Sequence, residues 1–124
     1  MKKILVVEDN RVVALDIVAH LKASGYTTLA AFDAVSGLST AVKERPNLII
    51  LDISMPAGGG FMVAERVNAL PALIGTPIIF LTGSDRSADR KRAAEVSAAA
   101  FLEKPYDSAA LLTAVRSALG ESAS

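Results

Sequence analysis

The stretch KILVVEDNRVVALDIVAHLKA, residues 3–23, contains the unit from which the fold is built. It opens with Lys3–Val7, a short, mostly apolar and β-branched run that is typical of a strand covered on both faces. Further along, Val13, Ile17 and Leu21 recur at intervals of four residues and form the apolar stripe of a helix. A strand followed directly by an amphipathic helix predicts one step of a parallel α/β sheet.

The same alternation continues to the end of the chain. Glycine or proline separates the segments, as at Gly25, Pro46 and Pro71, where helices are expected to end. The predicted strands are Lys3–Val7, Thr27–Phe32, Leu48–Leu51, Pro77–Leu81 and Ala99–Leu102. The predicted helices are Arg11–Ala23, Val35–Glu44, Phe61–Leu70, Ala88–Val96 and Ser108–Leu119. Five strands and five helices in strict alternation predict an α/β fold with a doubly wound parallel sheet and right-handed crossovers.

Composition restricts the class of protein. The chain has 124 residues, 52% of them hydrophobic, and 13 basic side chains balance 13 acidic ones. This suits one domain with its own core and excludes intrinsic disorder. With a net charge of zero, the chain lacks the excess of basic residues that nucleic-acid-binding surfaces need. Its aliphatic runs are far shorter than the roughly 20 residues that cross a bilayer. Because no cysteine is present, a disulfide scaffold is excluded and a reducing compartment fits, so we expect a cytoplasmic protein without direct nucleic-acid or membrane contacts.

Polar residues stand at the carboxyl ends of four predicted strands. They are Glu8 and Asp9 after the first strand, Asp52 after the third, Thr82 after the fourth and Lys104 after the fifth. In a doubly wound sheet these ends share one edge, where ligands bind. Carboxylates held together repel one another unless a hard cation such as Mg²⁺ bridges them. A nearby hydroxyl and ammonium can bind an anion, so the set predicts a site for a phosphoryl group on a carboxylate.

Four short motifs resemble the receiver domain of two-component response regulators, of the chemotaxis-regulator type. They are VVEDN at 6–10, LDISMP at 51–56, FLTG at 80–83 and FLEKP at 101–105. Each motif is weak alone, but four in order at the ends of strands one, three, four and five are specific. The resemblance covers residues 3–119. It implies a flavodoxin-like sheet with strand order 2-1-3-4-5, a receiver domain over residues 1–120 and a tail or start of a linker over 121–124.

The resemblance also implies a phosphorylation site with a metal. Asp52 would accept the phosphoryl group, and Glu8 and Asp9 would hold Mg²⁺ (or Mn²⁺). Asp52 itself and the backbone carbonyl of Ser54 would complete the protein ligands of the metal.

Further residues are implied to bind the phosphoryl group and to respond to it. Thr82 would hydrogen-bond one phosphoryl oxygen and Lys104 would pair with another. Thr82 and Phe101 would form the switch pair, and the Lys104–Pro105 peptide bond would be cis.

The implied function is a phosphorylation switch rather than an enzyme. A phosphohistidine of a histidine kinase or phosphotransfer protein would donate to Asp52, and the domain would promote its own phosphoryl transfer and slow dephosphorylation. The change would reach a surface formed by the fourth helix, fifth strand and fifth helix. That surface would contact a downstream protein target or a tethered output domain.

Other interpretations fit the residues less well. A binding-only receiver would never be phosphorylated, but the full set of phosphorylation residues is present. A phosphatase using an aspartyl phosphate requires a second Asp two residues after the first, where this chain has Ser54. A flavin binder requires a Ser/Thr-rich phosphate loop after the first strand, where Glu8 and Asp9 would repel the phosphate. The one histidine, His20, follows Asp16 by four residues, which predicts a helix-surface pair.

Two positions depart from the family's pattern. Residues 58–60 are three consecutive glycines, where similar receivers commonly have Asp or Asn before a single glycine. Because extra glycines lose more entropy on folding and Gly59 removes a possible N-cap, we expect a mobile loop over residues 57–61. Ser97 replaces a usual glycine before the fifth strand, and it would be strained if the backbone there needs a positive φ.

Overall fold

The computed structural model describes residues 2–55, 59–83 and 98–121. Within these residues, five parallel strands form one sheet in the order β2-β1-β3-β4-β5. The strands are β1 Lys3–Val7, β2 Thr27–Ala31, β3 Leu48–Asp52, β4 Ile78–Thr82 and β5 Ala100–Glu103. The described helices are α1 Arg11–Ala23, α2 Ala34–Glu44, α3 Gly59–Ala69 and α5 Ser108–Ala118. The fold class and strand order are confirmed, while the predicted helix over 88–96 and Ser97 lie outside the described residues.

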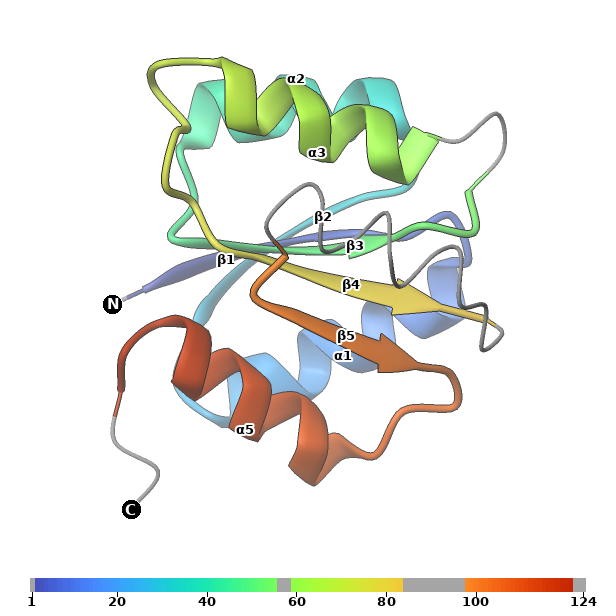
Figure 1. Cartoon of the computed structure of the whole chain (residues 1–124). Helices are drawn as coiled ribbons and strands as arrows, with labels where there is room; N and C mark the ends of the chain where they lie inside the picture. The colour runs from blue at the N-terminus through green and yellow to red at the C-terminus, as the bar shows by residue number, and fades with distance from the viewer. Residues whose placement is uncertain (1, 56–58, 84–97, 122–124) are drawn as a thin grey trace.

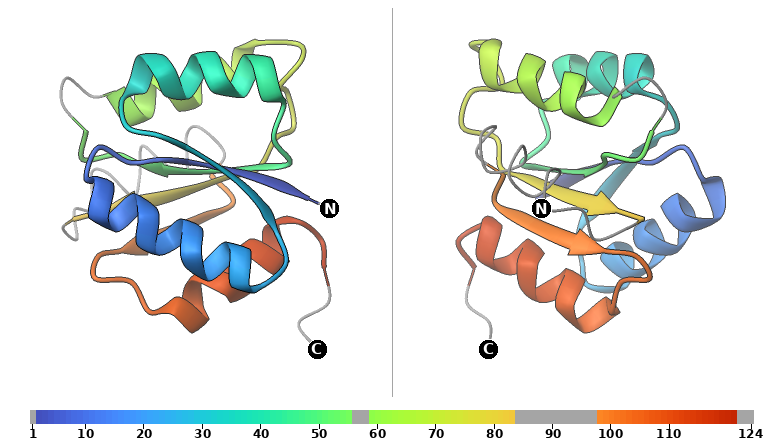
Figure 2. Two further views of the ribbon diagram at one scale, coloured as in Figure 1. Left: turned by 180° about the vertical axis from the view of Figure 1, so that it is seen from behind. Right: turned by 45° about the vertical axis from the view of Figure 1, so that its right-hand side comes forward.

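Helices cover both faces of the sheet. Helices α1 and α5 lie on one face and α2 and α3 on the other (Figure 1), and the two turned views show the same layers (Figure 2). Each strand contributes side chains to both faces of the sheet, because successive side chains point in opposite directions. Leu5 and Val7 therefore pack under α2 and α3, whereas Ile4 and Val6 pack under α1 and α5. Across residues 2–55, 59–83 and 98–121, none of the helices has the length and apolar character to span a bilayer.

Helix α1 begins beside the first pair of acids. The side chain of Asn10 caps the helix by accepting the N–H groups of Val12 and Val13 at 3.0 and 3.2 Å. Such a cap is worth about 1 kcal/mol. The helix ends at Ala23 with Ser24 as its C-cap, and Gly25 follows with φ of +93°, which confirms the predicted left-handed ending.

Strand register places two acids next to each other. Val7 pairs with Leu51 across β1 and β3, so Glu8 and Asp52, the next residues along each strand, become neighbours. Because side chains alternate between faces, Glu8 continues the row of Val6 on the side of the sheet that α1 and α5 cover. The same alternation of side chains that builds the core therefore also determines on which face of the sheet Glu8 lies.

The glycine-rich start of α3 corrects the predicted mobile loop. Gly59, Gly60 and Phe61 belong to α3 and are buried, so the prediction is wrong for these three residues; residues 57 and 58 lie outside the described ones. A Cβ atom on Gly60 would lie 2.4 Å from the carbonyl oxygen of Asp52. A Cβ atom on Gly59 would lie 2.9 Å from the Cβ of Ala34. These glycines allow α3 to approach the end of β3 closely.

Candidate functional site

Three carboxyl groups gather at the carboxyl edge of the sheet. Each of Glu8, Asp9 and Asp52 offers an oxygen, and these oxygens all lie within 4.8 Å of one another. Glu8 and Asp52 are buried, at 0% and 1% exposure, and Asp9 is exposed. The strand ends therefore bring the three acids together as the sequence predicted. At this spacing the charges repel strongly, so the group favours a cation or a bound proton.

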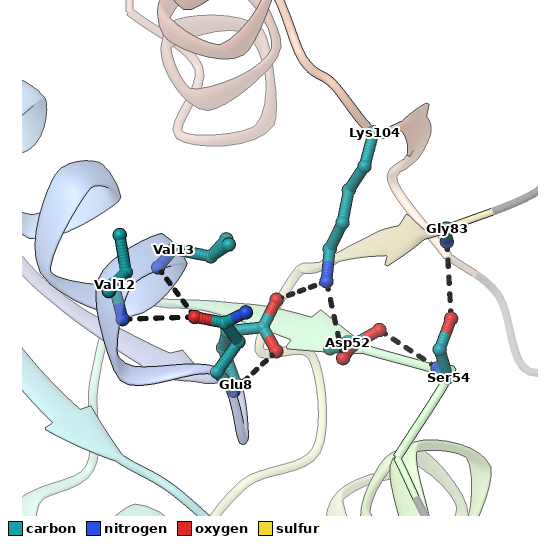
Figure 3. A network of polar contacts seen from close by, with 8 residues as sticks. Glu8, Val12, Val13, Asp52, Ser54, Gly83 and Lys104 are labelled. Atoms are coloured by element: carbon teal, nitrogen blue, oxygen red, sulfur yellow. Dashed lines mark hydrogen bonds and ion pairs between the residues drawn. The ribbon is translucent and has the colours of Figure 1, made fainter.

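Lys104 reaches into this acidic group from the end of β5. Its Nζ contacts Oε1 of Glu8 and lies 3.4 Å from Oδ2 of Asp52 (Figure 3). Its backbone N–H donates to the carbonyl oxygen of Thr82 at 2.7 Å, which fixes the start of the loop on the neighbouring strand. The ammonium thus neutralises part of the charge of two buried carboxylates.

Burial and the contacts with neighbouring charges act in opposite directions on the pKa values of Glu8 and Lys104. Burial raises the pKa of Glu8 to about 7, although the hydrogen bond from Lys104 acts in the opposite direction. Burial alone would lower the pKa of Lys104, but its contacts with Glu8 and Asp52 outweigh burial and raise this pKa. Lys104 therefore remains charged at neutral pH, whereas Glu8 shares the cluster's excess of negative charge and is readily protonated.

A chain of hydrogen bonds joins Asp52 to the end of β4. The N–H of Ser54 donates to Oδ1 of Asp52 at 2.8 Å, and the N–H of Gly83 donates to Oγ of Ser54 at 3.1 Å (Figure 3). Thr82, directly before Gly83, is buried at 1% exposure. The turn after β3 and the end of β4 are thereby held together beside the Asp52 carboxylate.

Two further predicted residues lie on β5 and just after it. Phe101 pairs with Phe80 across β4 and β5, and its half-buried ring packs against the core under α2 and α3. The Lys104–Pro105 peptide bond is cis, as the resemblance implied. All of the predicted site residues therefore lie at or near the carboxyl edge of the sheet.

The sequence motifs did not predict the cavity beside the acids. A cavity of about 230 Å³ borders the site, with walls from three separate loops. Its lining residues are Asp9, Phe32, Asp33, Ala34 and Met55. The guanidinium carbon of Arg11 lies 4.0 Å from the centroid of the Phe32 ring. Because these residues come together only in the folded chain, no single stretch of sequence signals the cavity.

The strand order, the carboxylate group at the switch in that order and the lysine at its edge define a signalling domain of the two-component type. The family model of the response regulator receiver domain matches residues 4–116. The chain therefore belongs to the response regulator receiver domain family, whose members are regulatory, phosphorylation-dependent switches in two-component signalling.

Curated relatives share this domain as part of longer proteins. The response regulator PleD of Caulobacter vibrioides is 34% identical over 115 residues, which are 93% of this chain and 25% of PleD. The transcriptional activator protein IrlR of Burkholderia pseudomallei is 35% identical over 117 residues, which are 94% of this chain and 50% of IrlR. The chain thus spans a quarter to a half of the length of these relatives.

Solved structures match nearly end to end. The Vibrio cholerae chemotaxis protein CheY4 has a TM-score of 0.89 and 29% identity, covering 95% of this chain and 98% of that chain. A response regulator from Chloroflexus aurantiacus has a TM-score of 0.90 and 26% identity, covering 97% of this chain and 98% of that chain. These similarities confirm the flavodoxin-like receiver fold that the motifs implied.

Proposed function

We propose that the chain accepts a phosphoryl group on Asp52 from the phosphohistidine of a histidine kinase or phosphotransfer protein. The observation that supports this most is the position of Asp52, whose Oδ2 lies 3.4 Å from the ammonium of Lys104 and whose Oδ1 receives the N–H of Ser54. In the transfer, an oxygen of Asp52 forms a bond to phosphorus as the phosphorus–nitrogen bond breaks. The departing imidazole keeps the electron pair of that bond.

The residues present fit Mg²⁺ (or Mn²⁺). Hard cations prefer oxygen ligands, and Glu8, Asp9 and Asp52 offer carboxylate oxygens within 4.8 Å of one another. The ammonium of Lys104 contacts two of the three carboxyl groups, so a divalent ion would balance the negative charge that this one ammonium does not neutralise. We assign the metal to these three side chains and to the backbone carbonyl of Ser54. When bound, the ion supplies further neutralisation of the transferring phosphoryl group.

We assign the conformational response to phosphorylation of Asp52 to three residues, Thr82, Lys104 and Phe101. The hydroxyl of Thr82 donates to one phosphoryl oxygen, and the ammonium of Lys104 leaves Glu8 to pair with another. The acyl phosphate adds up to about two negative charges, which is the differential interaction that shifts the equilibrium between two conformations. Phe101 then turns from its half-buried position into the space near Thr82.

The partner surface in this proposal consists of the fourth helix, β5 and α5. The residues predicted for the fourth helix, 88–96, lie outside the described part of the chain. We assign residues 1–120 to the receiver domain and 121–124 to a tail or the start of a linker. The partner surface then contacts either a tethered output domain or a separate downstream protein. We infer a cytoplasmic protein without direct nucleic-acid or membrane contacts. It promotes its own phosphoryl transfer and slow dephosphorylation and has no other enzymatic activity.

Intact-mass measurement with a small phosphodonor and Mg²⁺ tests this function. We expect wild type to gain the mass of one phosphoryl group and Asp52→Asn to gain none. A wild-type chain that never gains mass would favour a binding-only receiver. Equal labelling of both proteins would remove Asp52 from its proposed role.

A further inference from the structure

We propose that Tyr106 is a positioning residue for Lys104, acting through a hydrogen bond to Asp16. The inference rests on the proposed function, because Lys104 is there the partner of the phosphoryl group. The hydroxyl of Tyr106 donates to Oδ2 of Asp16 on α1, 90 residues away in the sequence. No motif includes this pair, and neither residue stands at a strand end.

The hydrogen bond joins the same two segments as the central ion pair. Glu8 stands just before α1 and Lys104 just after β5. Asp16 lies further along α1, and Tyr106 follows Lys104 by two residues. The Glu8–Lys104 and Asp16–Tyr106 contacts therefore both connect the segment from the end of β1 to the middle of α1 with the loop that enters α5. We therefore expect a change at one contact to alter the separation at the other.

The loop that carries Lys104 is anchored on both sides of that residue. On one side, the N–H of Lys104 itself donates to the carbonyl oxygen of Thr82 at 2.7 Å. On the other, the half-buried ring of Tyr106 packs against the core under α1 and α5, and its hydroxyl donates to Asp16. Immediately afterwards Asp107 caps α5. The hydroxyl of Tyr106 is thus the polar anchor on the far side of Lys104.

The charges favour a lasting hydrogen bond. Burial raises the pKa of Tyr106, and the neighbouring Asp16 raises it further, so the hydroxyl keeps its proton throughout the neutral range. Oδ1 of Asp16 lies 3.7 Å from Nε2 of His20, the surface pair that the spacing predicted, which leaves Oδ2 for Tyr106. Hydrogen bonds to ionised acceptors are stronger than neutral ones. Because the side chain of Asp16 is 58% exposed, we expect a moderate effect on the position of Lys104.

Tyr26 provides a matched control. It is the other of the two tyrosines in the chain, and its hydroxyl donates to Oε1 of Glu121 at 2.6 Å. This contact lies at the opposite edge of the sheet, since Tyr26 precedes β2 and Glu121 follows α5. Tyr26→Phe therefore removes the same kind of hydrogen bond without touching the loop of Lys104.

The test compares Tyr106→Phe, Asp16→Ala, their double variant and Tyr26→Phe in the full chain. The rate of phosphoryl transfer from acetyl phosphate is measured at saturating Mg²⁺, and melting temperatures are recorded. We expect Tyr106→Phe and Asp16→Ala each to lower the rate by roughly two- to tenfold. The double variant should lose no more than either single one. Tyr26→Phe should keep the wild-type rate even where it lowers the melting temperature.

A second measurement follows Lys104 without any phosphoryl group. Its two ε-proton NMR resonances should be separate in wild type and in Tyr26→Phe, because the ammonium is held in one place. They should merge in Tyr106→Phe and Asp16→Ala. Wild-type rates and resonances in Tyr106→Phe would overturn the inference, as would an equal loss of rate in Tyr26→Phe. If wild type takes up no phosphoryl group, the proposed function fails, and the resonances alone decide whether Tyr106 positions Lys104.

Discussion

Lys104 and Glu8 form an ion pair in which the carboxylate is fully buried and the side chain of the lysine is 20% exposed. The same ammonium lies 3.4 Å from Asp52, so one positive charge is shared between two buried carboxyl groups. Removing two charges from water is costly, and their attraction repays the cost only when the geometry is good. One ammonium does not neutralise both carboxyl groups, so negative charge remains at the carboxyl ends of β1 and β3, the adjacent strands between which the strand order reverses.

Lys104→Met tests how far the fold depends on this shared charge. Removing one partner of a buried pair typically costs 3–5 kcal/mol, but Glu8 can take up a proton, so we expect a loss of roughly 1–3 kcal/mol in the free energy of unfolding. Denaturant unfolding measures it. Adding Glu8→Gln to Lys104→Met should recover part of the loss, because Asp52 is then the one carboxyl group of the former ion pairs left buried without the ammonium. A double variant less stable than Lys104→Met would contradict this explanation.

Mg²⁺ should stabilise the folded chain. The acidic group exists only in the folded protein, so Mg²⁺ binding there increases the free energy of unfolding by mass action, by about 2.7 kcal/mol at a free concentration 100 times the Kd, and the melting temperature rises with it. A thermal melt with and without millimolar Mg²⁺ measures the effect. Asp9→Asn is the control, because Asp9 is exposed and its loss should remove the Mg²⁺ effect without harming the fold. An equal shift in Asp9→Asn would place the ion elsewhere.

The approach of α3 to β3 predicts losses of stability of different size for alanine substitutions at two adjacent glycines. A Cβ on Gly60 would meet backbone atoms, the Asp52 oxygen at 2.4 Å and the Ile53 Cα at 2.7 Å, which cannot move aside easily. Gly60→Ala should therefore lower the free energy of unfolding by roughly 1–3 kcal/mol. A Cβ on Gly59 would meet side-chain atoms and not backbone, the Cβ of Ala34 at 2.9 Å and the Cβ of Met55 at 3.9 Å, so Gly59→Ala should cost less than Gly60→Ala. Equal stabilities of the two variants would contradict the close packing at Gly60.

Residue patterns predicted much of this molecule, and the reasons for the limits are physical. Alternating apolar segments were enough to predict the sheet and to place Glu8, Asp52 and Lys104 at one edge, because a parallel sheet brings the carboxyl ends of its strands together. The order of the strands came from the resemblance, since alternation alone permits several orders. Local propensity marked Gly59 and Gly60 as a loop, yet tertiary packing decides their conformation, because α3 needs their small size next to Asp52.

Contacts between segments that are distant in the sequence could not be predicted either. Tyr106 and Asp16 stand 90 residues apart, and neither has a pattern that signals the other. The full burial of Glu8 likewise depends on the elements around it, and this burial raises its pKa to about 7. Such features follow from three-dimensional neighbours and appear only once the chain is folded.

Both tyrosines should titrate late in the folded protein. Burial, followed by a carboxylate hydrogen-bond acceptor, raises the pKa of Tyr26 and of Tyr106 above the usual value near 10. Because each folded-state pKa exceeds the unfolded one, the resulting stability is complete below about pH 10 and is lost as the pH rises through the folded values. Ultraviolet titration of the phenolates checks this. Midpoints near 10 in the native protein, equal to those in denaturant, would contradict the hydrogen bonds to Glu121 and Asp16.

Asp52 as the acceptor of the phosphoryl group is the claim on which the proposed function rests, and chemical trapping locates that group directly. After treatment with a small phosphodonor and Mg²⁺, borohydride reduces an aspartyl phosphate to homoserine, and peptide mass spectrometry identifies the converted residue. We expect conversion at Asp52, dependent on both phosphodonor and Mg²⁺. Conversion at Asp9 or any other residue, or no conversion at all, would contradict the proposed function.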